Sequence, residues 1–132
     1  MTVTGIDHVQ VAAPLGCEAE ARAFYGQLLG LEELAKPEAL AVRGGCWFGA
    51  GAQELHVGVE EPFTPARKAH PSFVVTDLDE VAARLAAAGI DVAFDDRIPG
   101  TRRFETADPF GNRLEFRSAV DPGSQLFREP GS

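Results

Sequence analysis

The sequence predicts an α+β protein in which two βαβββ units form a curved mixed sheet. Each half of the chain has an alternating stretch, an amphipathic stretch that ends at a glycine, and three short alternating stretches. Gly30 and His56 are separated by 26 residues (56 minus 30), and so are Gly89 and Glu115 (115 minus 89). A repeat of about 60 residues is too long for a solenoid, so we expect one unit used twice.

The first unit is expected over about residues 4–60. Residues 4–12 alternate in polarity, which is typical of a strand. Residues 18–29 place an apolar stripe on a helix, and Gly30 supplies the left-handed position that ends it. Turns that contain Gly and Pro then separate three short strands, expected around residues 33–34, 39–48 and 53–59.

The second unit repeats this order over about residues 68–118. A strand is expected over residues 70–76, and a helix over 78–88 follows the capping residue Asp77. Three strands follow, expected over residues 92–94, 103–106 and 113–118. Residues 1–120 are therefore predicted to form a single domain, and residues 121–132, rich in turn formers, a loose C-terminal tail.

Composition argues against several classes of function. A chain of 132 residues with 45% hydrophobic content can build a core without disulfides, and Cys17 and Cys46 are expected to be small core residues. The net charge of −8 argues against a nucleic-acid partner. We find no apolar stretch of membrane-spanning length and no signal-peptide pattern, so we expect a cytoplasmic protein without a membrane partner.

The first and last strands of each unit have one apolar and one polar face, because side chains alternate across a strand. The apolar face is expected to pack under the helices and carries Val9, Val11, Leu55, Val57, Phe73, Val75, Leu114 and Phe116. The polar face carries all three histidines of the chain, His8, His56 and His70, and Glu115 in the fourth strand. Curvature toward this face would gather the four side chains in a cup.

Imidazole and carboxylate groups suit a divalent ion such as Zn²⁺, Fe²⁺, Mn²⁺ or Ni²⁺. We therefore expect one such ion per site, with open coordination positions for a small-molecule substrate. Glu54 faces the same side two residues before His56, and it is either a further ligand or a solvated edge residue.

Other side chains near the predicted cup are candidate substrate contacts. Gln10 lies on the same polar face. Arg103 and Arg113 could hold a carboxylate, phosphate or enolate group. Trp47 could form a wall against an aromatic or apolar substrate.

Four motifs resemble those of a known family. They are Ile6-Asp7-His8-Val9, Ala23-Phe24-Tyr25 with Leu29-Gly30-Leu31, His70 ahead of Phe73 and Asp77-Leu78, and, as the most specific, Asp108-Pro109-Phe110-Gly111-Asn112-Arg113-Leu114-Glu115. Across residues 4–118 the chain thereby resembles the vicinal oxygen chelate superfamily. That superfamily includes glyoxalase I, bleomycin-resistance proteins, extradiol dioxygenases and fosfomycin-resistance enzymes.

The resemblance implies the glyoxalase, bleomycin-resistance and dihydroxybiphenyl dioxygenase fold. It also implies metal ligands on the first and last strand of each unit, which map to His8, His56, His70 and Glu115. Glyoxalase I should have Glu on the fourth strand, where this chain has His56 with Glu54 two residues earlier; the gapless repeat favours His56. A homodimer with sites shared between chains is implied as well.

The function expected from these features is a metal-dependent enzyme. It would bind a small oxygen-bearing substrate by bidentate chelation and stabilise an enolate-like or oxyanionic intermediate. Glu115 or Glu54 could act as the general base. Lyase or isomerase, dioxygenase and thiol-transferase reactions all fit. The alternative is a non-catalytic, drug-sequestering protein of the bleomycin-resistance type.

Overall fold

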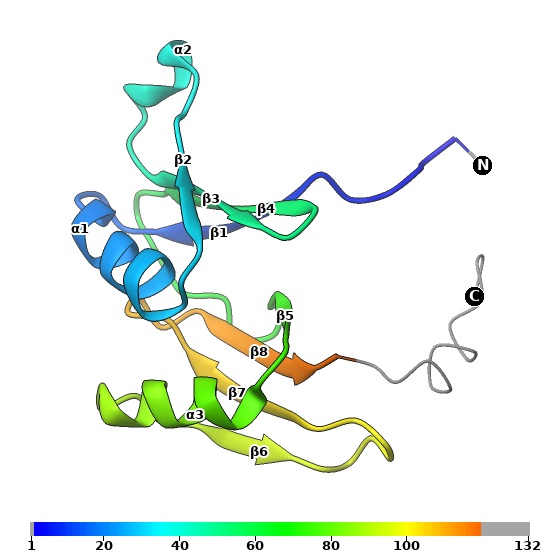
Figure 1. The fold of residues 1–132 in the computed structure, drawn as a ribbon. Coiled ribbons are helices and arrows are strands. Elements are labelled where there is room, and N and C mark those ends of the chain that lie inside the picture. The colour runs from blue at the N-terminus through cyan, green and yellow to red at the C-terminus, as the bar shows by residue number, and fades with distance from the viewer. Residues whose placement is uncertain (1, 120–132) are drawn as a thin grey trace. The chain divides into compact units, whose positions relative to one another are not determined.

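Each of two units has one four-stranded mixed sheet in the computed structural model, which describes residues 2–119 (Figure 1). Among these residues, unit 1 comprises residues 2–69 and 107–113, and unit 2 comprises residues 70–106 and 114–119. The tail predicted for residues 121–132 lies outside the described residues.

The sheet of unit 1 has the order β1-β4-β3-β2, with β1 parallel to β4 and the other pairs antiparallel. Its elements are β1 (His8–Ala13), α1 (Glu18–Ala21), the π-helix η1 (Arg22–Leu28), β2 (Glu32–Leu34), α2 (Glu38–Ala41), β3 (Cys46–Ala50) and β4 (Gln53–Val59).

The sheet of unit 2 repeats this topology with the order β5-β8-β7-β6, and β5 is parallel to β8. Its elements are β5 (Ser72–Val75), α3 (Leu78–Ala87), β6 (Ala93–Asp95), β7 (Arg103–Ala107) and β8 (Arg113–Ser118). The predicted fold class of two βαβββ units is confirmed.

The strand register also matches the 26-residue repeat. His56 lies opposite Gln10 in the β1–β4 pair, and Glu115 lies opposite Ser72 in the β5–β8 pair. His8 and His70 each precede these partners by two residues. The two units therefore place their candidate ligands at equivalent register positions, although His8 is the first residue of β1 and His70 lies two residues before β5.

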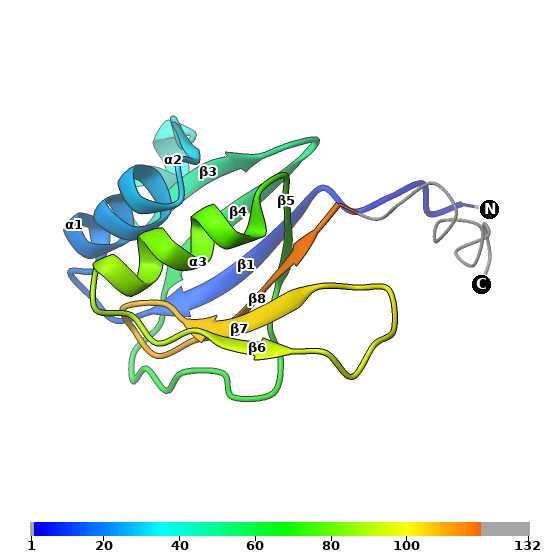
Figure 2. The same cartoon turned by 60° about the horizontal axis from the view of Figure 1, so that its bottom comes forward.

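Each unit has its own apolar core beneath its helix. In unit 1 the fully buried rings of Tyr25 and Phe48 have centroids 5.8 Å apart. In unit 2, α3 runs along one face of the sheet (Figure 2), and its buried residues include Leu78 and Leu85. These residues recur at helical spacing and form one buried stripe of α3, and strand residues of the same unit such as Leu114 are buried as well.

The helix expected over residues 18–29 is α-helical only at its start and continues as η1. The N–H of Leu29 bonds to the carbonyl of Phe24, which is the five-residue spacing of a π-helix. This wider turn reduces the angle between consecutive side chains, so Phe24 and Tyr25 can both be buried although they are adjacent.

Several strand predictions were wrong at their ends. β1 starts at His8 rather than residue 4 because β4, with which it pairs, starts at Gln53, opposite the residue before His8 in the register. Residues 39–41 belong to α2, not to a strand, because the carbonyl of Pro37 accepts bonds from the N–H groups of Leu40 and Ala41.

The predicted apolar face is wrong at Val9, which is 39% exposed. Phe73 and Val75 are only half-buried. These residues lie on β1 and β5, which within residues 2–119 stand at the ends of their four-stranded sheets, each next to one strand of its sheet. The central strand residues Leu55, Val57, Leu114 and Phe116 are buried as predicted.

The motif over residues 108–112 is structural. The buried carboxylate of Asp108 accepts bonds from the N–H groups of Phe110 and Asn112, and from the Tyr25 hydroxyl at 2.7 Å. The Asn112 amide donates to the carbonyl of Ala12 at 2.7 Å. Burial, and then the charge of Asp108, raises the pKa of Tyr25 well above its ordinary value. The motif thereby fastens η1 and β1 together inside unit 1.

Cys17 and Cys46 are buried free thiols, as expected for small core residues. Burial, together with the nearby Glu18 carboxylate, raises the pKa of Cys17 to about 11, so its thiol stays protonated at neutral pH. No helix within residues 2–119 is long and apolar enough to cross a bilayer.

Candidate functional site

In unit 1, three rings from neighbouring strands form a stack. His56 of β4 lies between Trp47 of β3, with centroids 4.0 Å apart, and His8 of β1, with centroids 4.1 Å apart. The interplanar angles are 6° and 13°, so the three planes are close to parallel. Trp47 faces His56 directly in the β3–β4 register. The stack holds the imidazole of His56 in one orientation and buries it.

A carboxylate contacts each of these two histidines. Nδ1 of His8 lies 2.9 Å from Oδ2 of Asp7, and Nε2 of His56 lies 2.9 Å from Oε1 of Glu54. A carboxylate on one imidazole nitrogen orients the ring and raises the basicity of the other nitrogen toward a metal. Nε2 of His8 is the nitrogen oriented in this way. Glu54 and His56 lie together, so either remains a candidate ligand.

In unit 2, the candidate ligands His70 and Glu115 are already in contact. Nε2 of His70 lies 3.3 Å from Oε1 of Glu115, and the hydroxyl of Ser72 donates to Oε2 at 2.8 Å. Burial alone would raise the pKa of Glu115, but hydrogen bonds from Ser72 and His70 and the charge of Arg103 outweigh it and lower the pKa. Glu115 is therefore a preformed carboxylate in a buried position.

Arg103 joins two carboxylates. Its Nη1 donates to Oε1 of Glu115 at 3.1 Å, and its Nη2 donates to Oδ2 of Asp95 at 2.8 Å. Its Nε is buried without a partner in the described part of the chain. The structure thus places Arg103, predicted to contact substrate, against the candidate ligand. Arg113, at the start of β8, has its Nη1 3.5 Å from the carbonyl of Arg67.

The residue types in each unit suit a divalent ion: two imidazoles in unit 1, and an imidazole and a carboxylate in unit 2. As they stand, no three His, Cys, Asp or Glu side chains within residues 2–119 are grouped closely enough to hold one. The stack explains the arrangement in unit 1. Two parallel imidazoles in different planes cannot both direct an in-plane lone pair at the same ion, so either His8 or His56 must turn for both to bind it.

A cavity of about 180 Å³ lies beside Trp47 in unit 1. It brings together Gln10 and Trp47, both predicted as substrate contacts. Its lining residues are Gln10, Lys36, Leu40, Arg43, Gly44, Trp47, Val57, Gly58 and Val59. Leu40 was not predicted to line a cavity because residues 39–48 were expected to form a strand, and Lys36 was not predicted because it lies in the turn before them.

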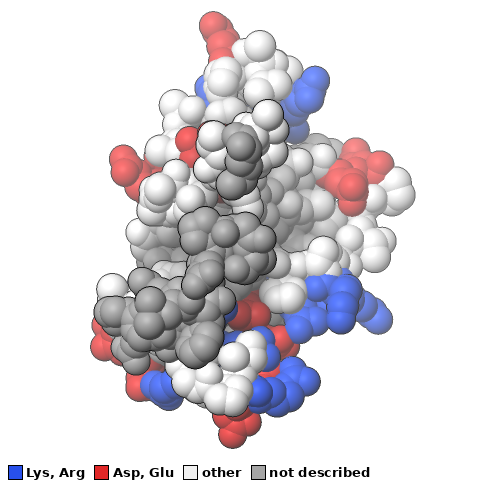
Figure 3. Space-filling model, turned by 90° about the vertical axis from the view of Figure 1, so that its right-hand side faces the viewer, with Lys and Arg blue, Asp and Glu red and all other residues white. Residues whose placement is uncertain are grey.

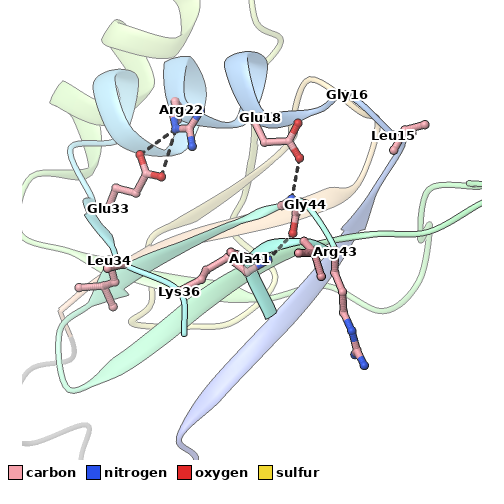
Figure 4. Close-up of a pocket in the computed structure, with 13 residues that line it drawn as sticks. Leu15, Gly16, Glu18, Arg22, Glu33, Leu34, Lys36, Ala41, Arg43 and Gly44 are labelled. Atoms are coloured by element: carbon pink, nitrogen blue, oxygen red, sulfur yellow. Dashed lines mark hydrogen bonds and ion pairs between the residues drawn. The ribbon is translucent and has the colours of Figure 1, made fainter. Parts of the chain in front are cut away.

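A larger cavity of about 600 Å³ lies between α1 and the segment that contains α2 (Figure 4). Four of its five charged side chains, those of Glu18, Arg22, Glu33 and Lys36, have partners within the protein, and Arg43 is the fifth. Arg22 Nε donates to Glu33 Oε1 at 2.9 Å, the carboxylate of Glu18 accepts the N–H of Gly45 at 2.6 Å, and Lys36 donates to the carbonyl of Gly44. We therefore assign this cavity no ligand. On the face shown in Figure 3, acidic and basic side chains are interspersed, so the described part of this face carries no extended patch of a single charge.

Comparisons with known proteins give one family. The family model described as the Glyoxalase/Bleomycin resistance protein/Dioxygenase superfamily matches residues 5–116. A glyoxalase family protein from Bacillus anthracis is 56% identical, with a TM-score of 0.87 over 89% of this chain and 97% of that chain.

Two more distant structures share the fold. A lactoylglutathione lyase from Agrobacterium tumefaciens is 24% identical, with a TM-score of 0.69 over 90% of this chain and 96% of that chain. A fosfomycin resistance protein from Listeria monocytogenes is 17% identical, with a TM-score of 0.76 over 97% of this chain and 100% of that chain. A search of curated proteins gave no match. With the family model covering most of its length, the chain belongs to the glyoxalase, bleomycin resistance protein and dioxygenase superfamily.

Proposed function

We propose that this protein is a metal-dependent enzyme that acts on a small substrate with two neighbouring oxygen atoms. The observation that carries the proposal is the repeated placement of metal-ligating residues. In the β1–β4 register His8 lies two residues before Gln10, the partner of His56, and in the β5–β8 register His70 lies two residues before Ser72, the partner of Glu115, just ahead of β5. A duplicated fold has no structural need for ligating side chains at all four positions.

One divalent ion, Zn²⁺, Fe²⁺, Mn²⁺ or Ni²⁺, would be held by these four side chains in the assembled protein and would supply Lewis acidity to the substrate oxygens. The reaction would be of the lyase or isomerase, dioxygenase or thiol-transferase kind. The protein is proposed to be a cytoplasmic homodimer in which each site takes residues from both chains.

The two candidate carboxylates differ in what they can do. Glu115 is buried, and its carboxylate accepts hydrogen bonds from Ser72 and Arg103, which lower its pKa. This arrangement suits a metal ligand of fixed position. The side chain of Glu54 is 38% exposed and contacts only the imidazole of His56 among the described residues. Glu54 is therefore free to turn toward a bound substrate, and we assign it the general base that would take a proton from carbon.

Metal content before and after chelation tests this proposal. The purified protein should hold about one equivalent of a divalent ion per site, and chelation should remove it. Glu115→Gln should weaken rebinding of the ion, measured by calorimetry, by at least about tenfold. Glu20→Gln is the matched control because Glu20 is exposed on α1. Equal ion affinity in both variants, or no bound metal at all, would contradict the proposal.

A crystal structure of the ion-loaded protein tests the geometry. Metal to nitrogen distances of about 2.0–2.3 Å are expected for His8, His56 and His70. The parallel stack of His8 on His56 should open in that structure. If the stack persists with metal bound, at most one of the two histidines is a ligand.

The second candidate is the non-catalytic sequestering of a cationic drug, which the net charge of −8 favours. Such binding would need no metal. Saturable binding of bleomycin to chelated protein, without turnover of any dicarbonyl or diol substrate by the loaded protein, would favour this second function.

A further inference from the structure

We propose that the cavity of about 180 Å³ beside Trp47 binds the carboxylate group of a small organic acid. The inference rests on the proposed function, because it names the substrate class of the same site. Trp47 joins the two features: it lines this cavity and stacks on the candidate ligand His56.

The charge of the lining is the first observation. Lys36 and Arg43 both line the cavity, and no Asp or Glu is among its lining residues. This is a local exception in a chain with 20 acidic and 12 basic residues. A cavity with only positive charges in its wall favours an anionic ligand.

The second observation is a set of hydrogen-bond donors without partners. Within residues 2–119, the Arg43 guanidinium, the Gln10 amide and the Trp47 indole N–H have no hydrogen-bond or ion-pair partner. Figure 4 shows Arg43 extending away from Glu18 and from the ion pair of Arg22 with Glu33. A carboxylate is the kind of group that accepts from several such donors at once.

The third observation is the space left for the Gln10 amide. A Cβ atom at Gly58 would lie 2.8 Å from Cδ of Gln10 and 2.9 Å from its Nε2. Glycine at this position therefore keeps the amide where it lines the cavity. Leu40 and the β4 valines supply an apolar wall, so the cavity fits an acid with a short hydrocarbon body.

Isovalerate and its neutral counterpart isovaleramide are suitable probes because they share a shape and differ in charge. Trp47 is the single tryptophan of the chain, so its fluorescence reports on the cavity. In chelated full-length protein, isovalerate should change this fluorescence saturably and bind at least about tenfold more tightly than isovaleramide. The same titrations are repeated after the protein has been loaded with Zn²⁺.

Arg43→Gln should abolish the preference for the acid. Arg84→Gln on α3, which changes the net charge equally, should retain it. Equal affinity of the wild-type protein for isovalerate and isovaleramide would overturn the proposal. The same preference for the acid in Arg43→Gln and Arg84→Gln would also overturn it. A preference for isovalerate that is seen only after Zn²⁺ loading would place the carboxylate on the ion and would overturn the proposal. Displacement of isovalerate by inorganic phosphate at a lower concentration would overturn it too, because the site would then prefer phosphate to a carboxylate. The metal content of the wild-type protein is measured separately, so failure of the metal proposal is seen independently.

Discussion

Gly45 determines how the chain enters β3. Its φ angle is +84°, and a Cβ atom there would lie 2.1 Å from the carbonyl oxygen of Val57. That oxygen belongs to the backbone of a central strand and cannot move without disturbing the sheet. A side chain at residue 45 is therefore excluded both by backbone conformation and by lack of space.

Gly45→Ala should lower the free energy of unfolding by about 2–4 kcal/mol, because left-handed strain and overpacking add. Gly51→Ala is the control: Gly51 also has a positive φ angle, +63°, but nothing lies within 4 Å of its Cβ position. Gly51→Ala should lower the free energy of unfolding by about 1 kcal/mol. Denaturant unfolding of both variants checks the difference, and equal losses would show that the clash at Val57 is relieved without cost.

Glu18 should make stability depend on acid pH. The N–H of Gly45 lowers the pKa of Glu18 below its ordinary value of 4.5. A carboxyl whose folded pKa is lowered stabilises the fold above the unfolded pKa, and this stabilisation is lost as pH falls through the folded pKa. Glu18→Gln should therefore unfold at a lower temperature than wild type at pH 7. This gap between the two unfolding temperatures should narrow below pH 4.5. A gap that stays constant down to pH 3 would contradict this assignment.

The candidate ligands show what a sequence can predict about single residues. The 26-residue repeat predicted that His56 and Glu115 are equivalent, and the structure pairs them with Gln10 and Ser72, each two residues after a candidate histidine. The stack of Trp47 on His56 and the bridge of Arg103 between two carboxylates were not predicted. These contacts depend on side-chain torsions and on the exact register of neighbouring strands, which a residue pattern does not encode.

At the scale of elements, α3 formed where its signals predicted it. Asp77 precedes the helix and accepts the N–H of Glu80 at 3.0 Å. Strand β5 was shorter than predicted because Pro71, directly before it, has no N–H to donate to a sheet. α2 was missed because four residues are too short for a recognisable helical period.

Asp77→Ala should destabilise the protein by about 0.5–2 kcal/mol through loss of this cap. Asp91→Ala, which removes the same charge from an exposed loop position, should change the free energy of unfolding by under about 0.5 kcal/mol. Thermal unfolding of the two variants is compared at one pH. Equal effects would mean that the charge of Asp77, not its cap bond, matters.

The β1–β4 pair gives a prediction about the cavity. Gly58→Ala is compatible with the strand backbone but should displace the Gln10 amide. Isovalerate affinity should fall at least about fivefold, while the free energy of unfolding changes by under about 1 kcal/mol. Gly49→Ala is the control, since the nearest atoms to its Cβ position are 3.9 Å away. Unchanged affinity in Gly58→Ala would remove Gln10 from the site.

At the scale of the whole molecule, the shared site can be tested by mixing. His8→Ala and Glu115→Ala chains with different tags are dissociated, mixed and purified as heterodimers. If each site takes these residues from different chains, a heterodimer has one undamaged site and should bind one metal ion, whereas neither parent binds any. Calorimetry measures the stoichiometry. Heterodimers that bind no ion would show that each chain builds its own site.

Residues 107–113 belong to unit 1, although the strands on either side of them extend through unit 2. The chain therefore passes between the units three times, at residues 69, 106 and 113, and no single cut separates them. A fragment that ends at residue 69 would lack Asp108 and Asn112, so the Tyr25 hydroxyl and the Ala12 carbonyl would lose their partners. If this gene arose by duplication, a one-unit ancestor would have received the equivalent loop from a second copy of the chain. Fusion of the two copies would then have made this contact intramolecular.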